Sequence, residues 1–556
     1  MVFDTVIRNG TVVDGTGLAP FRADVGIVDG RIADVGRIKE RGTVDIDADG
    51  HVVTPGFIDT HTHMDAQVFW DELGTNSCWH GVTTVVMGHC GFTLAPTRDD
   101  AHEMVVRNLE RAEDIAPAAL AAGIEWSWTD FAGYLDALDC QPKGLNYAAN
   151  IGHSALRTYV MGERAFEGEA TADDIAAMKQ ELETAMRAGA FGFTTSRTKH
   201  HQTSDDRPVA SRLASWGEVC ELVGVLGDLG VGIFQSVSDP DVPEGDPNLL
   251  LRELGLATGV PIASTAMNAK ALDQLEQSVA AGVRTWGLCH PRGIGAFTSF
   301  LTQTPFDRLP EWRELRALPI DEQRRQLADP DVVARLVKIA DEGPYGEAFG
   351  AEARAPEFDR MQVFRSPLPP NPTVAELAAA RGVHPVELMI QLALETDLRQ
   401  LFWQTMTPFD HDTVKRCLAH PDTVLGFSDS GAHVSQMADA SIQTHFLAHW
   451  VRERRDFTLA EAVRMLTLEP ARAYKFSDRG LLCEGMAADV NVFDPDTVAP
   501  TMPELVYDLP GGARRLVQQS TGFLATIVAG EVLVDRGVAT EARPGRLVRG
   551  AGARRN

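Results

Sequence analysis

Short apolar β segments and helical stretches alternate through the middle of this 556-residue chain. A clear helical stretch is TADDIAAMKQELETAMRAG (171–189), which has a Thr cap, an acidic first turn and a Gly stop. The β segments include GVTTVVMG (81–88), FGFTTS (191–196), VGIFQSV (231–237), VPIASTA (260–266), TWGLC (285–289) and TVLGFSD (423–429). Strands that alternate with helices predict a parallel sheet, and about eight such units predict a closed α/β barrel.

The two ends of the chain have a different pattern. Runs such as TVIRNGTVVDG and ATIVAGEVLVDRG cluster Val and Ile between turn residues. We therefore predict one small β-domain built from 1–56 together with 480–556, and a barrel over 57–479. Residues 300–375 read as irregular and charged, with a Pro-rich end (SPLPPNPT), which favours an insertion at about 296–375 over one barrel mouth. A solvated excursion without a role in the site is the alternative.

Composition limits the partners. The formal net charge of -27 argues against nucleic acid or an anionic membrane as a partner. It says little about a small-molecule substrate, which we expect on other grounds, because a local pocket can carry the opposite charge. No run of 18 apolar residues occurs, and the start, MVFDTVIRNG, does not read as a signal peptide. The seven cysteines contain no CxxC pair, so we expect a reduced, cytoplasmic protein.

Residues able to bind metal or transfer protons follow most of the β segments. His61 and His63, in TPGFIDTHTHMD, would point to the same face of an extended strand, as two ligands of one metal ion do. Other strand ends carry His89, Cys90, His153, Arg157, Arg197, Lys199, His200, His201, Cys289, His290, Arg292, Ser428, Asp429 and His433. The carboxyl ends of barrel strands meet at one face, where barrel enzymes hold their active sites. This convergence favours a metal centre over surface histidines.

Several segments carry a family resemblance: PGFIDTHTHMD, GVTTVVMGHCG, IGHSALR, GAFGFTT, GFSDSGAH, LTLEPARAYKF and GLLCEGMAADVNVFDPD. In this order along nearly the whole chain, they resemble the amidohydrolase superfamily, and within it the N-acyl-D-amino-acid deacylase (D-aminoacylase) group. The resemblance implies a distorted (β/α)8 TIM barrel with a composite β-sandwich, zinc, and hydrolysis of a C–N amide bond other than a peptide bond. Barrels of this superfamily are often dimers or larger, so a homo-oligomer remains open.

The resemblance also assigns site residues. His61 and His63 match the paired histidines of the first strand, and Cys90 matches a cysteine that these deacylases use as a metal ligand. Asp429 matches the aspartate after the eighth strand, which is a metal ligand and proton shuttle. A thiolate is a good zinc ligand, and a carboxylate beside a metal can take a proton from water and later donate it to the leaving amine.

Two expected histidines are absent. The family supplies one after strand five and one after strand six, whereas the nearest polar residues here are Gln235, Ser236, Ser264 and Asn268. Three interpretations stay open. One metal ion binds His61, His63 and Asp429 with Cys90 near or on it, which we favour, with help from His200. Alternatively, His200, His201, His290 or a carboxylated Lys199 substitutes for the missing ligands, or the metal is lost.

The substrate-binding candidates are His153, Arg197, Arg292 and His433. Arginine can bind a substrate carboxylate through two parallel hydrogen bonds. Each of these arginines could equally form a salt bridge within the protein. His153 fits a strand-end cap as well as a substrate contact. His433, four residues past Asp429, fits a role in orienting that carboxylate. The leading hypothesis is metal-dependent hydrolysis of an N-acylated amino acid or a similar small amide. The alternatives are opening of a cyclic amide, imide, lactone or other ester-like bond, and a metal-free binding protein.

Overall fold

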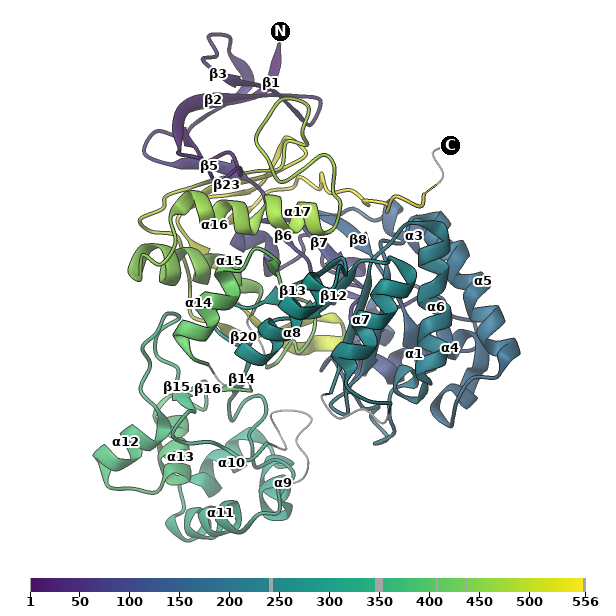
Figure 1. The fold of residues 1–556 in the computed structure, drawn as a ribbon. Coiled ribbons are helices and arrows are strands. Elements are labelled where there is room, and N and C mark those ends of the chain that lie inside the picture. Colours follow the sequence, from purple (N-terminus) through teal and green to yellow (C-terminus); the bar gives the residue numbers. More distant parts are fainter. Residues whose placement is uncertain (1, 240–243, 346–353, 407–408, 437–438, 554–556) are drawn as a thin grey trace.

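The computed structural model describes residues 2–239, 244–345, 354–406, 409–436 and 439–553 (Figure 1). Its centre is a ring of parallel strands in two hydrogen-bonded sheets, ordered β6-β7-β8 and β9-β10-β11-β12-β13-β17. These strands are β6 (Phe57–Asp59), β7 (Val82–Met87), β8 (Asn146–Ala149), β9 (Ile151–Gly152), β10 (Phe193–Arg197), β11 (Phe234–Ser238), β12 (Ile262–Thr265), β13 (Thr285–Cys289) and β17 (Thr423–Leu425).

Backbone hydrogen bonds join the two sheets at both seams. Between β8 and β9 lies only Asn150, whose N–H donates to the Met87 carbonyl at 3.0 Å. At the other seam, the Thr60 N–H donates to the Gly426 carbonyl at 3.1 Å, just beyond β6 and β17. With β8 and β9 counted as one broken strand, the predicted distorted (β/α)8 barrel is confirmed.

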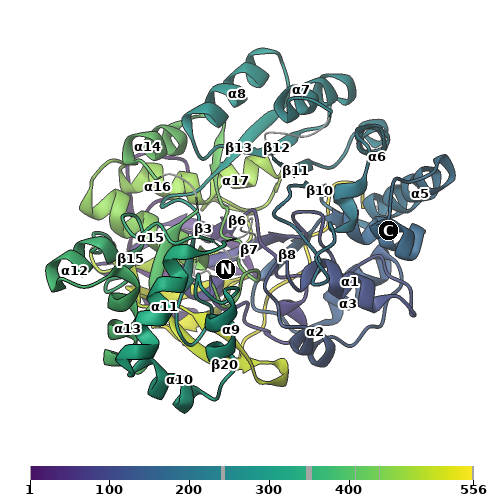
Figure 2. The ribbon, with the colours of Figure 1, turned by 90° about the horizontal axis from the view of Figure 1, so that it is seen from below.

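Helices surround the strands, and the view from below shows α5 to α8 outside β10 to β13 (Figure 2). The helix predicted from 171–189 is α5 (Ala172–Ala188), with a Thr171 capping box and a left-handed Gly189 stop. The others are α1 (His102–Leu109), α2 (Pro117–Gly123), α3 (Phe131–Cys140), α4 (His153–Met161), α6 (Trp216–Leu229), α7 (Pro247–Thr258), α8 (Ala269–Ala280), α14 (His411–Ala419), α15 (Ile442–His445), α16 (Leu459–Leu466) and α17 (Leu468–Ala473). Among the described helices, none has the length and apolar character needed to cross a bilayer.

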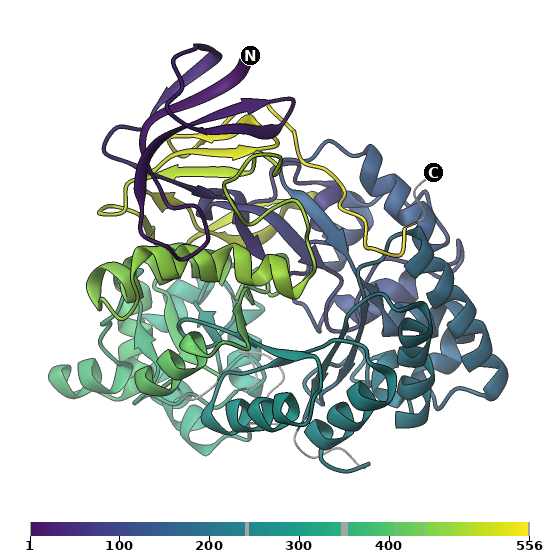
Figure 3. The same cartoon turned by 45° about the horizontal axis from the view of Figure 1, so that its top comes forward.

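A second sheet combines strands from both ends of the chain (Figure 3). Its order is β25-β24-β23-β18-β5-β1-β2-β3, with β4 also paired to β1. The strands are β1 (Phe3–Val12), β2 (Phe21–Val28), β3 (Arg31–Gly36), β4 (Gly42–Asp47), β5 (Val52–Pro55), β18 (Val490–Phe493), β23 (Phe523–Val528), β24 (Glu531–Asp535) and β25 (Val538–Ala539). The ends meet where β5 pairs antiparallel with β18, with Val53 opposite Val492, in a buried apolar core. The exact domain boundaries stay a prediction.

Between β18 and β23, the chain leaves this sheet and reaches the barrel. It forms β19 (Ala499–Pro500), β20 (Glu504–Leu509), β21 (Ala513–Val517) and β22 (Ser520–Thr521). The Arg515 guanidinium lies 3.1 Å from the Asp71 carboxylate, and the Leu516 N–H donates to the Val434 carbonyl at 2.7 Å. The tail therefore supports the loops that follow the first and last barrel strands.

The prediction that residues 300–375 are irregular is wrong over much of that range. They contribute to a lobe with its own buried core, which includes Phe306, Trp312 and Leu336. Proline begins α9 and α11, where a missing N–H costs nothing, so the prolines initiate helices instead of breaking them. Figure 1 shows the lobe at the opposite end of the molecule from β1 to β3. Its elements are β14 (Gly295–Thr298), α9 (Pro310–Arg316), α10 (Ile320–Leu327), α11 (Pro330–Glu342), β15 (Gln362–Val363), α12 (Val374–Arg381), α13 (Pro385–Glu395) and β16 (Phe402–Thr405).

The composite sheet gives a prediction on stability. Ile527 in β23 is 0% exposed in the core between the two chain ends, whereas Val538 in β25 is 69% exposed. Ile527→Ala removes buried methyl groups and leaves a cavity, so we expect a loss of about 2–5 kcal/mol in the free energy of unfolding. Val538→Ala, the control in the same sheet, should cost less than about 0.5 kcal/mol. Urea titration followed by circular dichroism measures both, and equal losses would contradict this account of the sheet.

Candidate metal centre

The candidate ligands leave the barrel at the carboxyl ends of the first, second and last strands. His61 and His63 follow β6, Cys90 follows β7, and Asp429 follows β17. Cys90 and Asp429 have positive φ values of 54° and 52°, the left-handed region that residues other than glycine rarely adopt. Non-glycine residues in this conformation cluster at functional sites, where the surrounding structure holds them. The strands thus place all four side chains at one mouth of the barrel.

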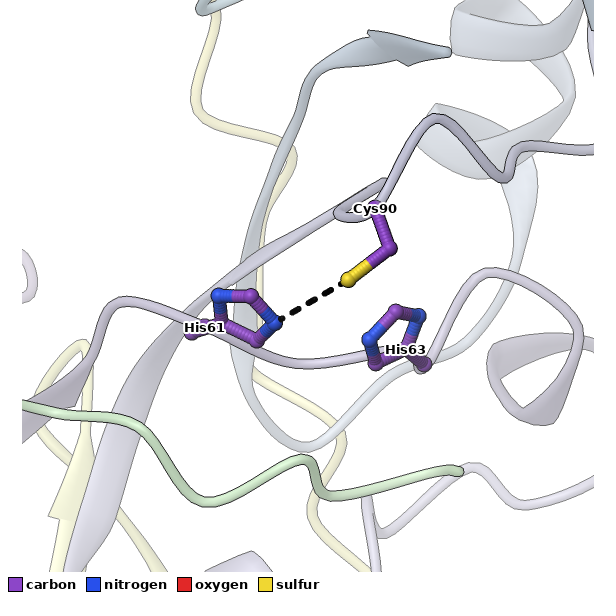
Figure 4. A group of neighbouring side chains, drawn as sticks. All are labelled: His61, His63 and Cys90. Atoms are coloured by element: carbon purple, nitrogen blue, oxygen red, sulfur yellow. Dashed lines mark hydrogen bonds between the residues drawn. The ribbon is translucent and has the colours of Figure 1, made fainter. Parts of the chain in front are cut away.

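Figure 4 shows the side chains of His61, His63 and Cys90 pointing toward one another. The imidazoles of His61 and His63 and the Cys90 thiol place one ligand atom each within 4.8 Å of one another. The His61 Nε2 lies 3.8 Å from the Cys90 Sγ. Asp429 completes the group, with its Oδ1 3.2 Å from His61 Nε2 and 3.5 Å from His63 Nε2.

Burial controls the charge states of these groups. It lowers the pKa of His61 and so favours the neutral imidazole that binds metal. It raises the pKa of the Cys90 thiol to about 12, so a thiolate at this position needs a neighbouring cation. Burial also opposes ionisation of Asp429, but His61 and His63 outweigh it and hold the pKa of that carboxyl well below its usual range. Asp429 is therefore ionised, with its side chain 12% exposed.

The donor set fits a divalent metal ion. Within the described residues, the His63 Nδ1 and the Asp429 Oδ1 are buried without a hydrogen-bond partner. Leaving such atoms unpaired costs free energy, which a coordinated cation offsets. Thiolate, imidazole and carboxylate are the donors that zinc takes in proteins.

Comparison with known proteins agrees with this chemistry. The model of the amidohydrolase family matches residues 45–534. The D-aminoacylase of Alcaligenes xylosoxydans xylosoxydans is 30% identical over 90% of this chain and 90% of its own length. The N-acyl-D-glutamate deacylase of the same organism is 28% identical over 98% of this chain and 96% of its own length.

Among solved structures, the N-acyl-D-glutamate deacylase of Bordetella bronchiseptica, complexed with zinc and a phosphonate inhibitor, has a TM-score of 0.65 and 26% identity. The match covers 99% of this chain and 100% of that one. The chain belongs to the amidohydrolase family. It is a metal-dependent hydrolase that acts on carbon–nitrogen amide bonds other than peptide bonds.

In β11, the fifth barrel strand, Gln235 is one of the polar residues nearest to the expected histidine position, and it contacts two histidines. The Gln235 Oε1 lies 3.1 Å from the His89 Nδ1, and its Nε2 lies 3.5 Å from the His61 Nδ1. The His89 ring also stacks on His61, with centroids 4.1 Å apart. Gln235 therefore orients His61. After strand six, Ser264 donates to the Trp286 carbonyl at 3.5 Å and Asn268 caps α8, so neither contact involves the cluster.

Lys199, His200 and His290 differ from His201 in their surroundings. Lys199 and His200 are exposed in the loop after β10, and the Lys199 N–H donates to Asp239 at 2.5 Å. The His290 Nε2 lies 3.4 Å from the Asp439 carboxylate. The next histidine in the β10 loop, His201, is close to Cys90, and with Glu113 it forms a second group of ligand atoms within 4.8 Å of one another.

Three of the substrate-binding candidates have protein partners. The His153 ring is buried, with Nδ1 2.8 Å from Thr195 Oγ1 and Nε2 2.9 Å from Glu218 Oε1. Arg197 donates to Glu244 at 2.5 Å, and the guanidinium of Arg292 pairs with Asp439. These contacts favour structural roles, and substrate binding by the three residues stays a prediction.

His433 differs from the other candidates because it lines an open cavity of about 640 Å³. It is 24% exposed in its side chain, and its Nε2 lies 3.7 Å from the Glu113 carboxylate. The insertion contributes to the same cavity, whose lining residues are Glu110, Arg111, Asp114, Pro117, His200, Ser204, Asp206, Gln303, Arg308, Arg313, His433 and Gln436. A polar cavity of this size beside the ligand cluster suits a small charged substrate.

Sequence reasoning missed Glu113. It lies in the turn after α1, away from any strand end, and is 1% exposed. Its Oε1 is 3.6 Å from His63 Nδ1. No motif marks this carboxylate, and only its burial beside the histidines reveals it.

The buried ion pair behind His153 gives a prediction on stability. Glu218 on α6 accepts from the Arg157 guanidinium at 2.7 Å, and both side chains are fully buried. Glu218→Gln leaves the arginine charge buried without its partner, so we expect a loss of about 3–5 kcal/mol in the free energy of unfolding. The control is Glu221→Gln, on the same helix as Glu218. It breaks a half-exposed pair with Lys179 of α5 and should cost at most about 1 kcal/mol. Similar urea midpoints for both variants would exclude a structural role for the buried pair.

Proposed function

We propose that this chain hydrolyses the amide bond of an N-acyl-D-amino acid, with His61, His63, Cys90 and Asp429 holding zinc. The observation that carries the proposal is the convergence of these four side chains, three of them buried, at the carboxyl ends of the barrel strands. The similarity to a D-aminoacylase and an N-acyl-D-glutamate deacylase over nearly the whole chain supports the substrate class. The donor set supports zinc. Seven free cysteines support a reducing, cytoplasmic location.

In the proposed mechanism, the ion, when bound, polarises the substrate carbonyl and makes water more acidic. The side chains of the protein position the metal ligands and transfer the proton. His61 and His63 keep their rings in place because Gln235 and Glu113 flank their Nδ1 atoms. The Asp429 carboxylate takes the proton from the attacking water, and later donates it to the nitrogen of the leaving amine. That amine and the free carboxylic acid leave through the adjacent cavity.

Asp429 suits the proton transfer for two reasons. Despite burial, His61 and His63 hold the pKa of this carboxyl well below its usual range, so it is the ionised carboxylate that a general base needs. Its backbone is also fixed, because the Asp429 N–H donates to the His61 carbonyl at 3.1 Å. A carboxylate held at a fixed distance from the reacting atoms avoids the entropic cost of finding them.

Asp429→Asn tests the proton shuttle. The amide keeps the shape of the side chain but cannot accept and return the proton, so we expect kcat for N-acyl-D-glutamate or another N-acyl-D-amino acid to fall by about 10²–10⁴-fold. Asp422→Asn, before the other end of β17, is the matched control and should keep wild-type kcat. Release of the free amine measures the rate. Full activity in Asp429→Asn would refute the proposed role.

Cys90→Ala tests the ligand set. Purified after growth with added zinc, the variant should contain less zinc than the wild type by elemental mass spectrometry, because it lacks the thiolate ligand. Cys289→Ala is the control, since Cys289 is also buried at a strand end but lies outside the ligand clusters of the described residues. Equal zinc content in wild type and Cys90→Ala would remove Cys90 from the site.

A substrate panel separates the proposal from the other reactions considered for this barrel. N-acyl-D-amino acids, their L enantiomers, cyclic imides and lactones are assayed with the zinc-loaded enzyme. Only cleavage of an N-acyl amide releases a free amino acid. The proposal expects the D series to react fastest, and turnover confined to cyclic substrates would replace it by ring opening.

A further inference from the structure

Glu113 is a buried carboxylate that the proposed mechanism uses only as a neighbour of His63. The turn that carries it is fixed on both sides. The Glu113 N–H donates to the Leu109 carbonyl of α1 at 2.9 Å, and its carbonyl accepts from the His433 N–H. The adjacent Asp114 accepts from the Ser435 hydroxyl at 2.7 Å. The loop that follows Asp429 therefore holds Glu113 at the barrel mouth.

The Glu113 carboxylate lacks a hydrogen-bond partner at one of its oxygens. Its described ion-pair partners are the imidazoles of His63 and His433, at 3.6 and 3.7 Å, which are too long for hydrogen bonds. The Oε1 is buried without a hydrogen-bond partner. A buried carboxylate in this state is costly unless a cation lies beside it.

Two further donors face this carboxylate. The Cys90 thiol, a Glu113 oxygen and a His201 ring nitrogen lie within 4.8 Å of one another. The His201 Nδ1 lies 2.7 Å from the Ser196 hydroxyl, which leaves Nε2 as the ring nitrogen able to bind a ligand. A hydrogen bond to one ring nitrogen commonly fixes the other for metal binding.

We propose that Cys90, Glu113 and His201 form a second binding position for a divalent metal ion, with Cys90 shared between this position and the one on His61, His63 and Asp429. Thiolate, carboxylate and imidazole donors select zinc or a similar ion. The second position deepens the proposed function and rests on its first metal site. It uses residues after α1 and β10, and so needs no ligand from strands five and six.

Charge supports two ions. With Cys90 as thiolate, the two ligand groups hold three negative charges: the buried thiolate, the buried Glu113 and Asp429, which is 12% exposed. One divalent ion leaves a net negative charge in the barrel, whereas two ions more than balance the three charges. Metal ions of binuclear hydrolase sites lie about 3.5–4 Å apart, a spacing that a shared ligand permits.

The competing explanation is that Glu113 only orients His63, as carboxylates do behind many metal-bound histidines. The two explanations differ in what they expect of His201. An orienting Glu113 makes no use of His201, whereas the second position needs both side chains. Paired variants at Glu113 and His201 therefore separate them.

The experiment measures zinc by elemental mass spectrometry after equilibrium dialysis against buffered zinc. The proteins are wild type, Glu113→Gln, His201→Ala and His200→Ala, each checked for folding by circular dichroism. We expect about two equivalents of zinc in wild type and in His200→Ala, and about one in Glu113→Gln and His201→Ala. His200→Ala is the matched control, because it removes the neighbouring imidazole from the same loop. His201→Cys supplies another zinc ligand and should restore about two equivalents.

Cobalt gives a readout that does not depend on activity or on counting ions. Titration of the apoprotein with Co²⁺ should give a thiolate-to-cobalt absorption band that keeps growing up to the second equivalent, because Cys90 contacts both ions. In Glu113→Gln the growth should stop at the first equivalent. Growth to the second equivalent in that variant would overturn the assignment of Glu113 as a ligand.

Each other outcome is decisive. One equivalent in wild type, or two in both Glu113→Gln and His201→Ala, overturns the second position and leaves the first intact. Loss of zinc in Glu113→Gln with two equivalents in His201→Ala also overturns it and assigns Glu113 to His63. No zinc in wild type refutes the proposed function itself, so the two failures are distinguishable.

Discussion

The hydrogen-bonded seam between the first barrel strand and the loop after β17 determines the site. Across it, the His63 N–H donates to the Ser430 carbonyl at 2.8 Å, and the Asp429 N–H donates to the His61 carbonyl at 3.1 Å. These bonds join residues more than 360 positions apart and fix Asp429 over the two histidines. If the barrel did not close here, the carboxylate and the imidazoles would belong to separate edges of a sheet.

The closed mouth concentrates negative charge where water is scarce. Asp429, Glu113 and the Cys90 thiol lie together among imidazoles, and burial lowers the pKa of one of them, His61, so that this ring is a weak counter-charge. Such an arrangement has a high free energy without cations and a low one with them. We infer that metal binding contributes to the stability of the barrel mouth as well as to hydrolysis.

Two segments outside the barrel contact the same barrel mouth or line the cavity beside it. The hairpin between β18 and β23 contacts Asp71 and Val434 beside the first and last strand ends. The helical lobe after β13 lines the cavity with Gln303, Arg308 and Arg313. Variation in this lobe can therefore change the substrate without changing the ligand cluster, because it touches the cavity and leaves the strand ends in place.

The sequence by itself predicted the barrel and its strands, and its resemblance to the deacylases predicted metal binding by His61, His63, Cys90 and Asp429. Alternating β and helical runs have a local period, and barrel topology sends every strand end to one face, so the barrel and the convergence of its strand ends follow from short-range patterns. The helices within residues 310–342 were not predicted, because proline and charged residues are also common in loops. What stabilises these helices is a shared buried core that includes Trp312, and that core is visible only in the tertiary structure.

Only the tertiary structure decided what stands around the four strand-end residues. Gln235 and Glu113 carry no motif, and His201 cannot be told from His200 by sequence. Each gains its place from a long-range contact: Gln235 with His89, Glu113 with His63, and His201 with Cys90. Residue type and spacing set which atoms can bind a metal. Distances between atoms far apart in the chain set which of them meet, because they depend on how the whole barrel packs.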